Sequence, residues 1–368
     1  MRISNARVFA DGVFQEGGIE FDTRITALGD VTGGEDAEGC YLIPGLVDIH
    51  THGAMGEDAS DGIAEGLVTM SRYYARGGVT AWCPTTMTVS EPEIVAALET
   101  IRNFVRPEDG AKAAGIHLEG PFLCYAKRGA QAAENLRKPD AELFCRFNEV
   151  SGKAIRLVTV ACEEEGGMDF IDRVSPVCTV SLGHTVATYD TAAEGYRRGA
   201  SHATHLYNGM PALAHREPGV IGAARDAGAT VELICDGLHI HPAVVRATFA
   251  MFGENVVLVS DSLRCAGMPD GDYVLGGQPI TMTNGKATLS GSDTLAGSSI
   301  HLMDGLRNAV RFGIPLEAAV TAATAAPARA IRMEHQLGRL AVGRCADLVL
   351  LDKDLQVKAV YVDGNRIL

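Results

Sequence analysis

Residues 45–53 read GLVDIHTHG, an apolar run that leads to two histidines and ends at a glycine. The apolar half predicts a buried β-strand. Because successive side chains of a strand point to opposite faces, His50 and His52 lie on the same face. A pair of imidazoles at a strand end is one way to bind a zinc-class metal ion. Two packed or solvated histidines would give the same local pattern, so the interpretation depends on the rest of the chain.

The composition is that of a globular protein and narrows the possible partners. The 368 residues are 46% hydrophobic and 21% charged, and no apolar run approaches the length of a membrane span. A formal net charge of −14 argues against nucleic acid or an anionic membrane, but it leaves a small anionic substrate possible. The N-terminus has no signal-peptide core, and none of the nine cysteines forms a C-x-x-C pair. We therefore expect a cytoplasmic protein without a disulfide framework.

The middle of the chain alternates short apolar runs with segments typical of helices. Eight such runs are the number that a (β/α)₈ TIM-type barrel requires. The expected strands are 46–50, 79–85, 114–119, 155–161, 179–184, 202–206, 230–236 and 256–261. The expected helices include 63–75, 91–105, 141–149, 189–198 and 242–252.

Both ends of the chain have the pattern of short strands and turns. We expect residues 1–44 and 334–368 to form a small β-sandwich domain, and residues 45–333 to form the barrel. A glycine-rich excursion follows the eighth strand at 267–293, with a hairpin at Asn284-Gly285. Helices are expected to resume over 299–332.

Polar residues recur where the predicted strands end. Glu119, His184, His205 and Asp261 close four strands, and His239 follows a fifth. Active sites of such barrels form at the C-terminal ends of the strands. Glu119, His184 and His205 are the best ligand set, because one carboxylate and two imidazoles leave a coordination position open for water.

Other polar residues have simpler interpretations. His117 is expected to support the site or the packing, and His202 to be a barrel histidine with a partner. Asp48 is buried in an apolar run and is expected to orient a neighbouring ligand by a hydrogen bond. Asp261 has the alternative role of a helix N-cap. Loop or surface positions are expected for His241, His301 and His335.

A family resemblance extends over nearly the whole chain. The motifs, in order, are PGLVDIHTHG, GIHLEGPFL, SLGHT, THLYNGM, HREPGVIGAA, DGLHIHP, LVSDS and TLAGSS. Together they resemble the amidohydrolase superfamily and, within it, the N-acetylglucosamine-6-phosphate deacetylases. The C-terminal segment GRLAVGRCADLVLLD resembles the closing sandwich segment of the superfamily.

The resemblance implies metal-dependent hydrolysis of the acetamide of N-acetylglucosamine 6-phosphate, in amino-sugar catabolism or cell-wall recycling, by a homodimer. The family's metal ligands fall on Glu119, His184 and His205. Asp261 would be the general base and acid, and His239 would contact the acetyl oxygen. Contacts to the sugar phosphate would come from Ala130, Gln131, Asn208, Gly209, Arg216, Leu295, Ala296 and Gly297. Arg216 would be placed to reach the phosphate site of the neighbouring subunit.

Three positions bear on how far the resemblance extends. Gln131 stands where family members often carry histidine, and Gly209 where they often carry alanine. The change at Gln131 is the one expected to alter recognition of the substrate, since backbone contacts survive at Gly209.

The pair His50 and His52 is complete, whereas some relatives replace its first histidine by glutamine. A second ion held by this pair and bridged by Glu119 is therefore possible, so one and two ions both stay open. Zinc is the preferred divalent metal, with iron or another transition metal as alternatives.

Three rival functions remain. The nearest is the same reaction on the galacto epimer, N-acetylgalactosamine 6-phosphate. A cyclic-amide hydrolase such as a dihydroorotase is disfavoured, because such sites usually bridge two metals with a carboxylated lysine and no lysine ends a barrel strand here. A non-catalytic barrel scaffold would predict broken ligand positions, and none is broken.

Overall fold

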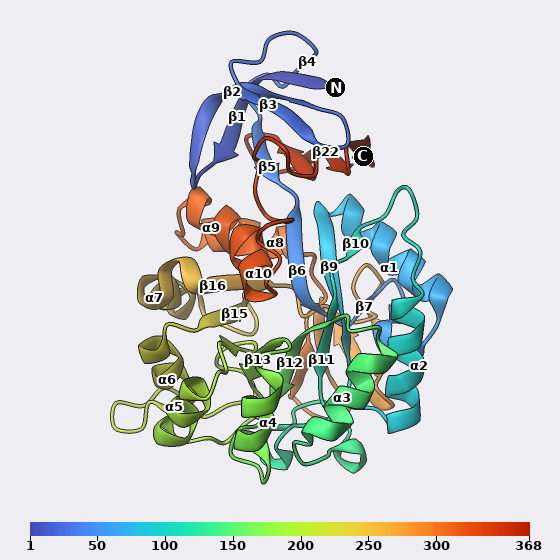
Figure 1. Ribbon diagram of the computed structural model, residues 1–368, viewed down its shortest axis with the longest axis vertical. Helices are drawn as coiled ribbons and strands as arrows, with labels where there is room; N and C mark the ends of the chain where they lie inside the picture. Colours follow the sequence, from blue (N-terminus) through green and yellow to red (C-terminus); the bar gives the residue numbers. More distant parts are fainter.

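The computed structural model describes residues 1–368 and contains a parallel barrel with a separate sheet built from both chain ends (Figure 1). Each barrel strand pairs in parallel with the next along the chain. The strands are β6 (Leu46–Thr51), β9 (Val79–Thr86), β11 (Ile116–Glu119), β12 (Ile155–Val160), β13 (Thr179–Leu182), β14 (His202–Ala203), β15 (Thr230–Ile234) and β16 (Val256–Val259). The eight predicted strands and the TIM-type fold are confirmed.

The barrel closes where its last strand meets its first. Asp261 N donates to His50 O, and His52 N donates to Ser262 O, both at 2.9 Å. The sixth strand is shorter than the expected 202–206, because His205 and Tyr207 have φ angles of 27° and 77° and turn the chain out of the strand.

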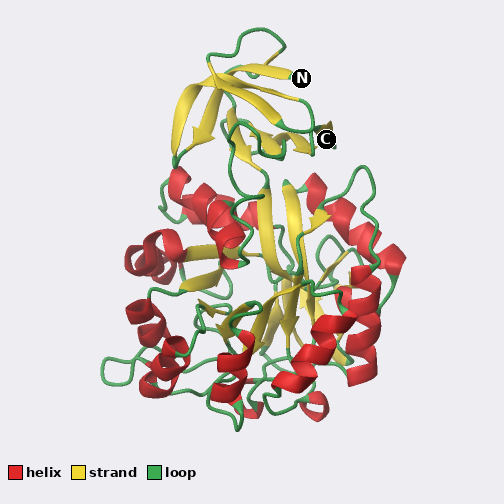
Figure 2. Ribbon diagram, in the orientation of Figure 1, coloured by secondary structure: helices red, strands yellow, loops and turns green.

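Helices surround the barrel (Figure 2). They are α1 (Ala64–Arg76), α2 (Glu91–Arg102), α3 (Ala141–Val150), α4 (Gly167–Val174), α5 (Tyr189–Arg197), α6 (Gly219–Ala227), α7 (Pro242–Phe252), α8 (Leu302–Arg311), α9 (Leu316–Ala323) and α10 (Ala325–Ala330). Short 3₁₀ turns are η1 (Ala59–Asp61), η2 (Tyr125–Lys127), η3 (Ala133–Asn135) and η4 (Gly253–Asn255). The expected helical segment 299–332 is divided into three helices, and the second helix ends at Arg102 rather than at residue 105.

Two helices, α4 and α6, are absent from the sequence-based expectation. Both begin at a glycine, which lowers intrinsic helix propensity. In α4 the buried side chains of Phe170, Ile171 and Val174 pack on the core, and such tertiary packing supplies most of the stability of a short helix. By contrast, Asp140 marks the start of α3 locally, because its Oδ1 accepts from the backbone N–H of Glu142 at 2.8 Å.

The chain termini share one sheet of order β23-β22-β21-β5-β1-β2-β3, with β4 paired to β1. Its strands are β1 (Arg2–Ala10), β2 (Val13–Phe21), β3 (Ile25–Gly29), β4 (Glu35–Asp36), β5 (Tyr41–Pro44), β21 (Leu348–Leu351), β22 (Val357–Val362) and β23 (Asn365–Arg366). The sheet curls over its own core, so that the rings of Phe21 and Tyr361 pack edge to face at 5.2 Å. The N- and C-termini consequently lie together at one end of the molecule (Figure 1).

An ion cluster joins the terminal sheet to the barrel. Lys112, on the short strand β10 (Lys112–Ala113), lies between Asp347 and Asp363, with Nζ 2.5 Å from Asp347 Oδ2 and 3.0 Å from Asp363 Oδ1. Arg106 adds a contact of 3.3 Å to Asp363. This cluster spans the two parts of the fold.

A four-stranded antiparallel sheet follows the barrel's last strand; it begins within the excursion expected at 267–293 and ends beyond it, at Gly297. It consists of β17 (Gly271–Leu275), β18 (Gln278–Thr283), β19 (Lys286–Leu289) and β20 (Leu295–Gly297). The predicted hairpin at Asn284-Gly285 is confirmed, with φ angles of 51° and 73° at the two turn residues. A further two-stranded piece is formed by β7 (Gly53–Ala54) and β8 (Glu57–Asp58). Through β20 the excursion returns to the strand ends of the barrel.

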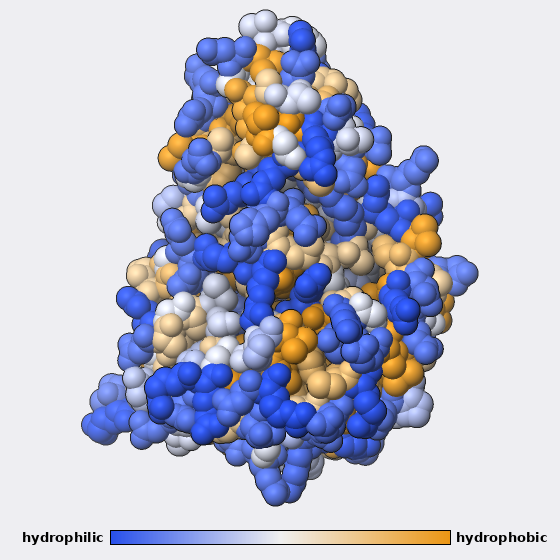
Figure 3. Space-filling view, in the orientation of Figure 1, coloured by the Kyte–Doolittle hydropathy of each residue, from blue (hydrophilic) through white to orange (hydrophobic).

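The largest apolar core lies between the barrel strands and the surrounding helices. No helix is both long enough and apolar enough to span a membrane. The face shown in Figure 3 is mostly hydrophilic, with small separate apolar areas.

Candidate active site

A cavity of about 320 Å³ opens at the C-terminal ends of the barrel strands. The sequence-predicted residues that line it are His52, Glu119, Ala130, Gln131, His184, His205, Asn208, Gly209, His239, Asp261, Leu295, Ala296 and Gly297. Residues from distant parts of the sequence thus meet in one pocket, as expected for this fold.

The predicted ligand set Glu119, His184 and His205 is assembled and buried. Nε2 of His205 lies 3.0 Å from Nε2 of His184, and each lies 3.1–3.2 Å from Glu119 Oε1. Two imidazole nitrogens and a carboxylate oxygen that face one another this closely, away from water, form a donor set suited to a zinc-class cation.

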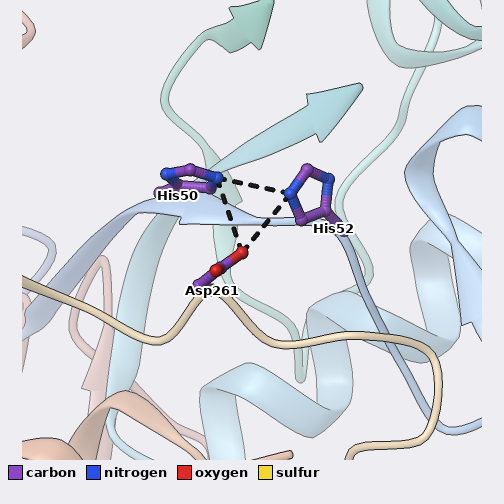
Figure 4. Close-up of side chains that lie close together, drawn as sticks. All are labelled: His50, His52 and Asp261. Carbon is purple, nitrogen blue, oxygen red and sulfur yellow. Dashed lines mark hydrogen bonds and ion pairs between the residues drawn. The ribbon is translucent and has the colours of Figure 1, made fainter. Parts of the chain in front are cut away.

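A second cluster adjoins the first and consists of His50, His52 and Asp261 (Figure 4). The Nε2 atoms of the two histidines are 3.3 Å apart, and they lie 3.5 and 3.4 Å from Asp261 Oδ1. Glu119 lies between the clusters, because its Oε2 is 3.2 Å from His52 Nε2 while its Oε1 faces the other histidines. The donors fit either one ion or two ions that share Glu119.

Contacts behind His184 and His52 direct their Nε2 atoms into the pocket. His184 Nδ1 donates to the carbonyl oxygen of Lys127 at 2.7 Å, and His52 Nδ1 donates to that of Thr85 at 3.2 Å. A carbonyl oxygen only accepts, so each ring in its neutral form carries its lone pair on Nε2. This is the form of histidine that binds a metal ion.

The backbone is strained at the strand ends. His184, His205 and Asp261 have φ angles of 47°, 27° and 48°, a region that non-glycine residues rarely adopt. Such conformations persist only where the surrounding structure holds them, and they are frequent at functional sites.

The histidines of the site determine the ionisation of its two carboxyl groups, Glu119 and Asp261. Burial opposes the ionised form of Glu119, but His50, His184 and His205 outweigh it and hold the pKa of this carboxyl group well below its usual range. For Asp261, burial is outweighed by His50 and His52, which lower the pKa of the carboxyl group. Both carboxylates are therefore ionised at neutral pH.

His239 is held by Asp236, a residue for which the sequence analysis assigned no role. Its Nδ1 donates to Asp236 Oδ2 at 2.7 Å, and Asp236 Oδ1 accepts the backbone N–H groups of Leu238 and His239. Burial lowers the pKa of His239, but Asp236 outweighs it and raises this pKa above its usual value. The spacing of three residues in Asp-Gly-Leu-His is the sequence signal that could have revealed this pair.

Gln131 reaches the pocket wall, where its amide contacts the site carboxylate. Its Nε2 donates to Glu119 Oε2 at 2.9 Å, and its Oε1 accepts from Thr88 N at 2.7 Å. The residue that departs from the family pattern therefore lies directly against a predicted metal ligand.

Several secondary expectations can be compared with the structure. His117 is buried with its Nε2 2.8 Å from Thr159 Oγ1, as a structural histidine, and His202 has the partners Thr230 and Glu232. Asp48 hydrogen-bonds a neighbouring candidate ligand, as expected, but through the backbone: its Oδ1 accepts from the N–H groups of His50 and Ser260, at 3.4 and 3.3 Å.

One further expectation is wrong: the N-cap alternative for Asp261 fails, because the next helix is α8 and begins at Leu302. His301 lies in the loop that leads into α8, as expected, and it is partly buried because it stacks on Tyr73 of α1 at 3.9 Å. His241 caps α7 and is exposed, as is His335.

The sequence analysis missed one buried carboxylate, Glu232 on β15, which contacts His50, His202 and His205. The signal was an acidic residue inside the apolar run TVELIC. Arg216 lies on the exposed loop between β14 and α6 and does not line the cavity.

Known proteins are similar to this chain in sequence and in structure. The family model described as Amidohydrolase family matches residues 41–367. The N-acetylglucosamine-6-phosphate deacetylase of Vibrio furnissii is 36% identical over 330 residues, which cover 89% of this chain and 82% of that protein. The N-acetylgalactosamine-6-phosphate deacetylase of Escherichia coli O157:H7 is 36% identical over 334 residues, with 90% and 88% covered.

Among solved structures, a mutant N-acetyl-D-glucosamine-6-phosphate deacetylase from Mycobacterium smegmatis, in complex with N-acetyl-D-glucosamine-6-phosphate, superposes with a TM-score of 0.95. It is 31% identical and covers 100% of this chain and 99% of its own. The match of the family model and the identity to curated relatives agree with the fold and with the residues gathered in the pocket. This chain belongs to the amidohydrolase family.

Proposed function

We propose that this protein hydrolyses the acetamide of N-acetyl-D-glucosamine 6-phosphate to D-glucosamine 6-phosphate and acetate. The observation that carries the proposal is the meeting of the ligand set Glu119, His184 and His205 with Asp261 and His239 in one cavity. The deacetylases among its relatives support the same reaction. The cellular role is amino-sugar catabolism or the recycling of cell-wall sugars.

The reaction depends on a divalent metal ion, for which zinc is the preferred candidate. Glu119, His184 and His205 would hold one ion, and His50 and His52 with Asp261 would hold a second. When bound, the ion lowers the pKa of the attacking water and polarises the acetamide carbonyl.

Asp261 and His239 carry out the proton transfer and the charge stabilisation. The ionised carboxylate of Asp261 accepts the proton of the attacking water and returns it to the leaving amine. Because Nδ1 of His239 donates to Asp236, its Nε2 is a donor only when the ring is protonated. The raised pKa favours this form, which donates to the developing oxyanion.

The phosphate requires a cation that the cavity itself lacks. No lysine or arginine is among the residues that line the cavity, whereas Asn208, Gly209 and β20 offer neutral polar groups. We propose that Arg216 of a neighbouring copy completes the site in a homodimer, since a guanidinium binds phosphate through two parallel hydrogen bonds. We also propose that residues 1–44 and 334–368 form one domain, that residues 45–333 form the other, and that the protein is cytoplasmic.

The galacto epimer is the second candidate, because a curated relative with that specificity is equally similar at 36% identity. An acetate-release assay tests both on the purified protein, with the gluco and galacto 6-phosphates and the unphosphorylated gluco sugar as substrates. We expect the highest kcat/KM on the gluco phosphate. A preference for the galacto phosphate would select the second candidate, and the absence of acetate from all three would reject deacetylation.

A further inference from the structure

Glu232 is a carboxylate that the mechanism above does not use. It lies on β15, its side chain is 0% exposed, and its neighbours Val231 and Leu233 are apolar and equally buried. Burying a carboxylate is unfavourable unless hydrogen bonds and charges satisfy it. Its partners should therefore show why it is there.

Both oxygens of Glu232 are engaged. Oε2 accepts from His50 Nδ1 at 2.8 Å and from the backbone N–H of His205 at 2.9 Å. Oε1 lies 3.1 Å from His202 Nε2, and the far side of that ring meets Thr230 Oγ1 at 2.6 Å. Only the contact with His50 reaches a side chain of the two metal clusters.

This contact determines what His50 can do. In its neutral, metal-binding form, a ring whose Nδ1–H donates to a carboxylate carries its lone pair on Nε2, and that atom lies 3.3 Å from His52 Nε2 and 3.5 Å from Asp261 Oδ1. In the first cluster, His184 takes its orientation from Lys127 instead. Glu232 meets His205 of the first cluster only through the backbone N–H, so it orients a ring in the second cluster alone.

We propose that Glu232 is a positioning residue that orients His50 and fixes its tautomer, and that it thereby gives the second cluster its affinity for a metal ion. This inference rests on the proposed function, because it requires that the clusters bind metal. Glu232 acts through His50 and touches neither substrate nor ion. Its effect should be largest on the second ion, because its contact with the first cluster is made by the backbone of His205 and not by the ring.

The test measures metal binding by the full-length protein. Holoprotein is dialysed against increasing concentrations of a chelator, and the zinc that remains is counted per chain. We expect the parent to bind two ions. Glu232→Ala should weaken the second ion by about 10–100-fold, the usual effect of removing such an outer contact. It should leave the first ion nearly unchanged.

Two variants separate positioning from a general effect on the fold. Glu232→Gln keeps an oxygen for His50 Nδ1–H and should restore part of the affinity. Thr230→Val removes the outer partner of His202 but leaves the contact between Glu232 and His50, so it should keep both ions. The visible spectrum of each cobalt-substituted variant reports the geometry of the sites independently of turnover.

Four results would overturn the inference: a parent that binds one ion, a Glu232→Ala variant that keeps both, equal weakening of both ions, or the same loss in Thr230→Val. Each is distinct from failure of the proposed function, which would appear as no acetate release by the parent. A parent that binds one ion and releases acetate would reject the role of Glu232 alone.

Discussion

Asp261 Oδ1 lies 3.4 Å from His52 Nε2, so the last barrel strand contributes to the same cluster as the first. The backbone N–H of Asp261 also donates to His50 O at 2.9 Å. Closure of the barrel and assembly of the second cluster therefore depend on the same pairing of strand ends. The proposed general base is thereby held with little freedom to move away from its target.

Substituting Asp261→Asn removes the proton acceptor while keeping the shape of the side chain. The turnover rate should fall by about 10²–10⁴, because the amide cannot accept the proton of the attacking water. The ion held by the first cluster should remain, which metal analysis checks. Asp293→Asn is the control, since Asp293 lines the same cavity and belongs to neither cluster. Normal turnover of Asp261→Asn would leave this residue without a catalytic role.

Substituting Arg216→Ala should lower kcat/KM for the phosphorylated sugar by roughly 10–10³, from the strength of charged hydrogen bonds. Activity on the unphosphorylated sugar should be poor in the parent and nearly unchanged by the substitution. Mixing Arg216→Ala with Asp261→Asn tests the dimer, because one hybrid site would combine an intact Asp261 with an intact Arg216 of the neighbour. If the mixture gained no activity, Arg216 would act within its own chain or not on the phosphate. Arg225→Ala, on α6, is the matched control.

The contact between Asp236 and His239 should make kcat/KM depend on pH. Asp236 raises the pKa of His239, so activity that needs the protonated ring falls as the pH rises through this value. Asp236→Asn removes the charge and lowers that pKa, so the basic limb of the profile of kcat/KM should move to lower pH. At neutral pH the loss should reach about 10²–10³, typical of removing one oxyanion donor. An unchanged basic limb would show that a different group titrates there.

We expect Lys112 to stabilise the junction between the terminal sheet and the barrel. Its removal leaves Asp347, 9% exposed, as a buried charge without its cation. Lys112→Ala should therefore lower the free energy of unfolding by about 2–4 kcal/mol, measured by urea denaturation. Lys138→Ala, which breaks an exposed pair with Glu165, should change it little. Equal effects of the two substitutions would show that the junction cluster contributes no more than a surface pair.

The sequence by itself determined the architecture and most of the pocket. Parallel barrel strands all present their C-terminal ends at one rim, so the residue that closes each apolar run is assigned to the site by its position in the chain. Glu119, His184, His205 and Asp261 follow from this rule without knowledge of any contact. The hairpin at Asn284-Gly285 could also be predicted from the sequence, because Asn and Gly favour the positive φ angles that a two-residue hairpin turn requires.

Only the tertiary structure decided which side chains meet inside the barrel. Glu232 contacts His50 across 182 positions of sequence, and Gln131 donates to Glu119 from a separate loop. Strand periodicity assigns a residue to a face, but it does not say which residue of another strand stands opposite. That choice depends on the stagger and closure of the barrel, which arise from the packing of all eight strands together.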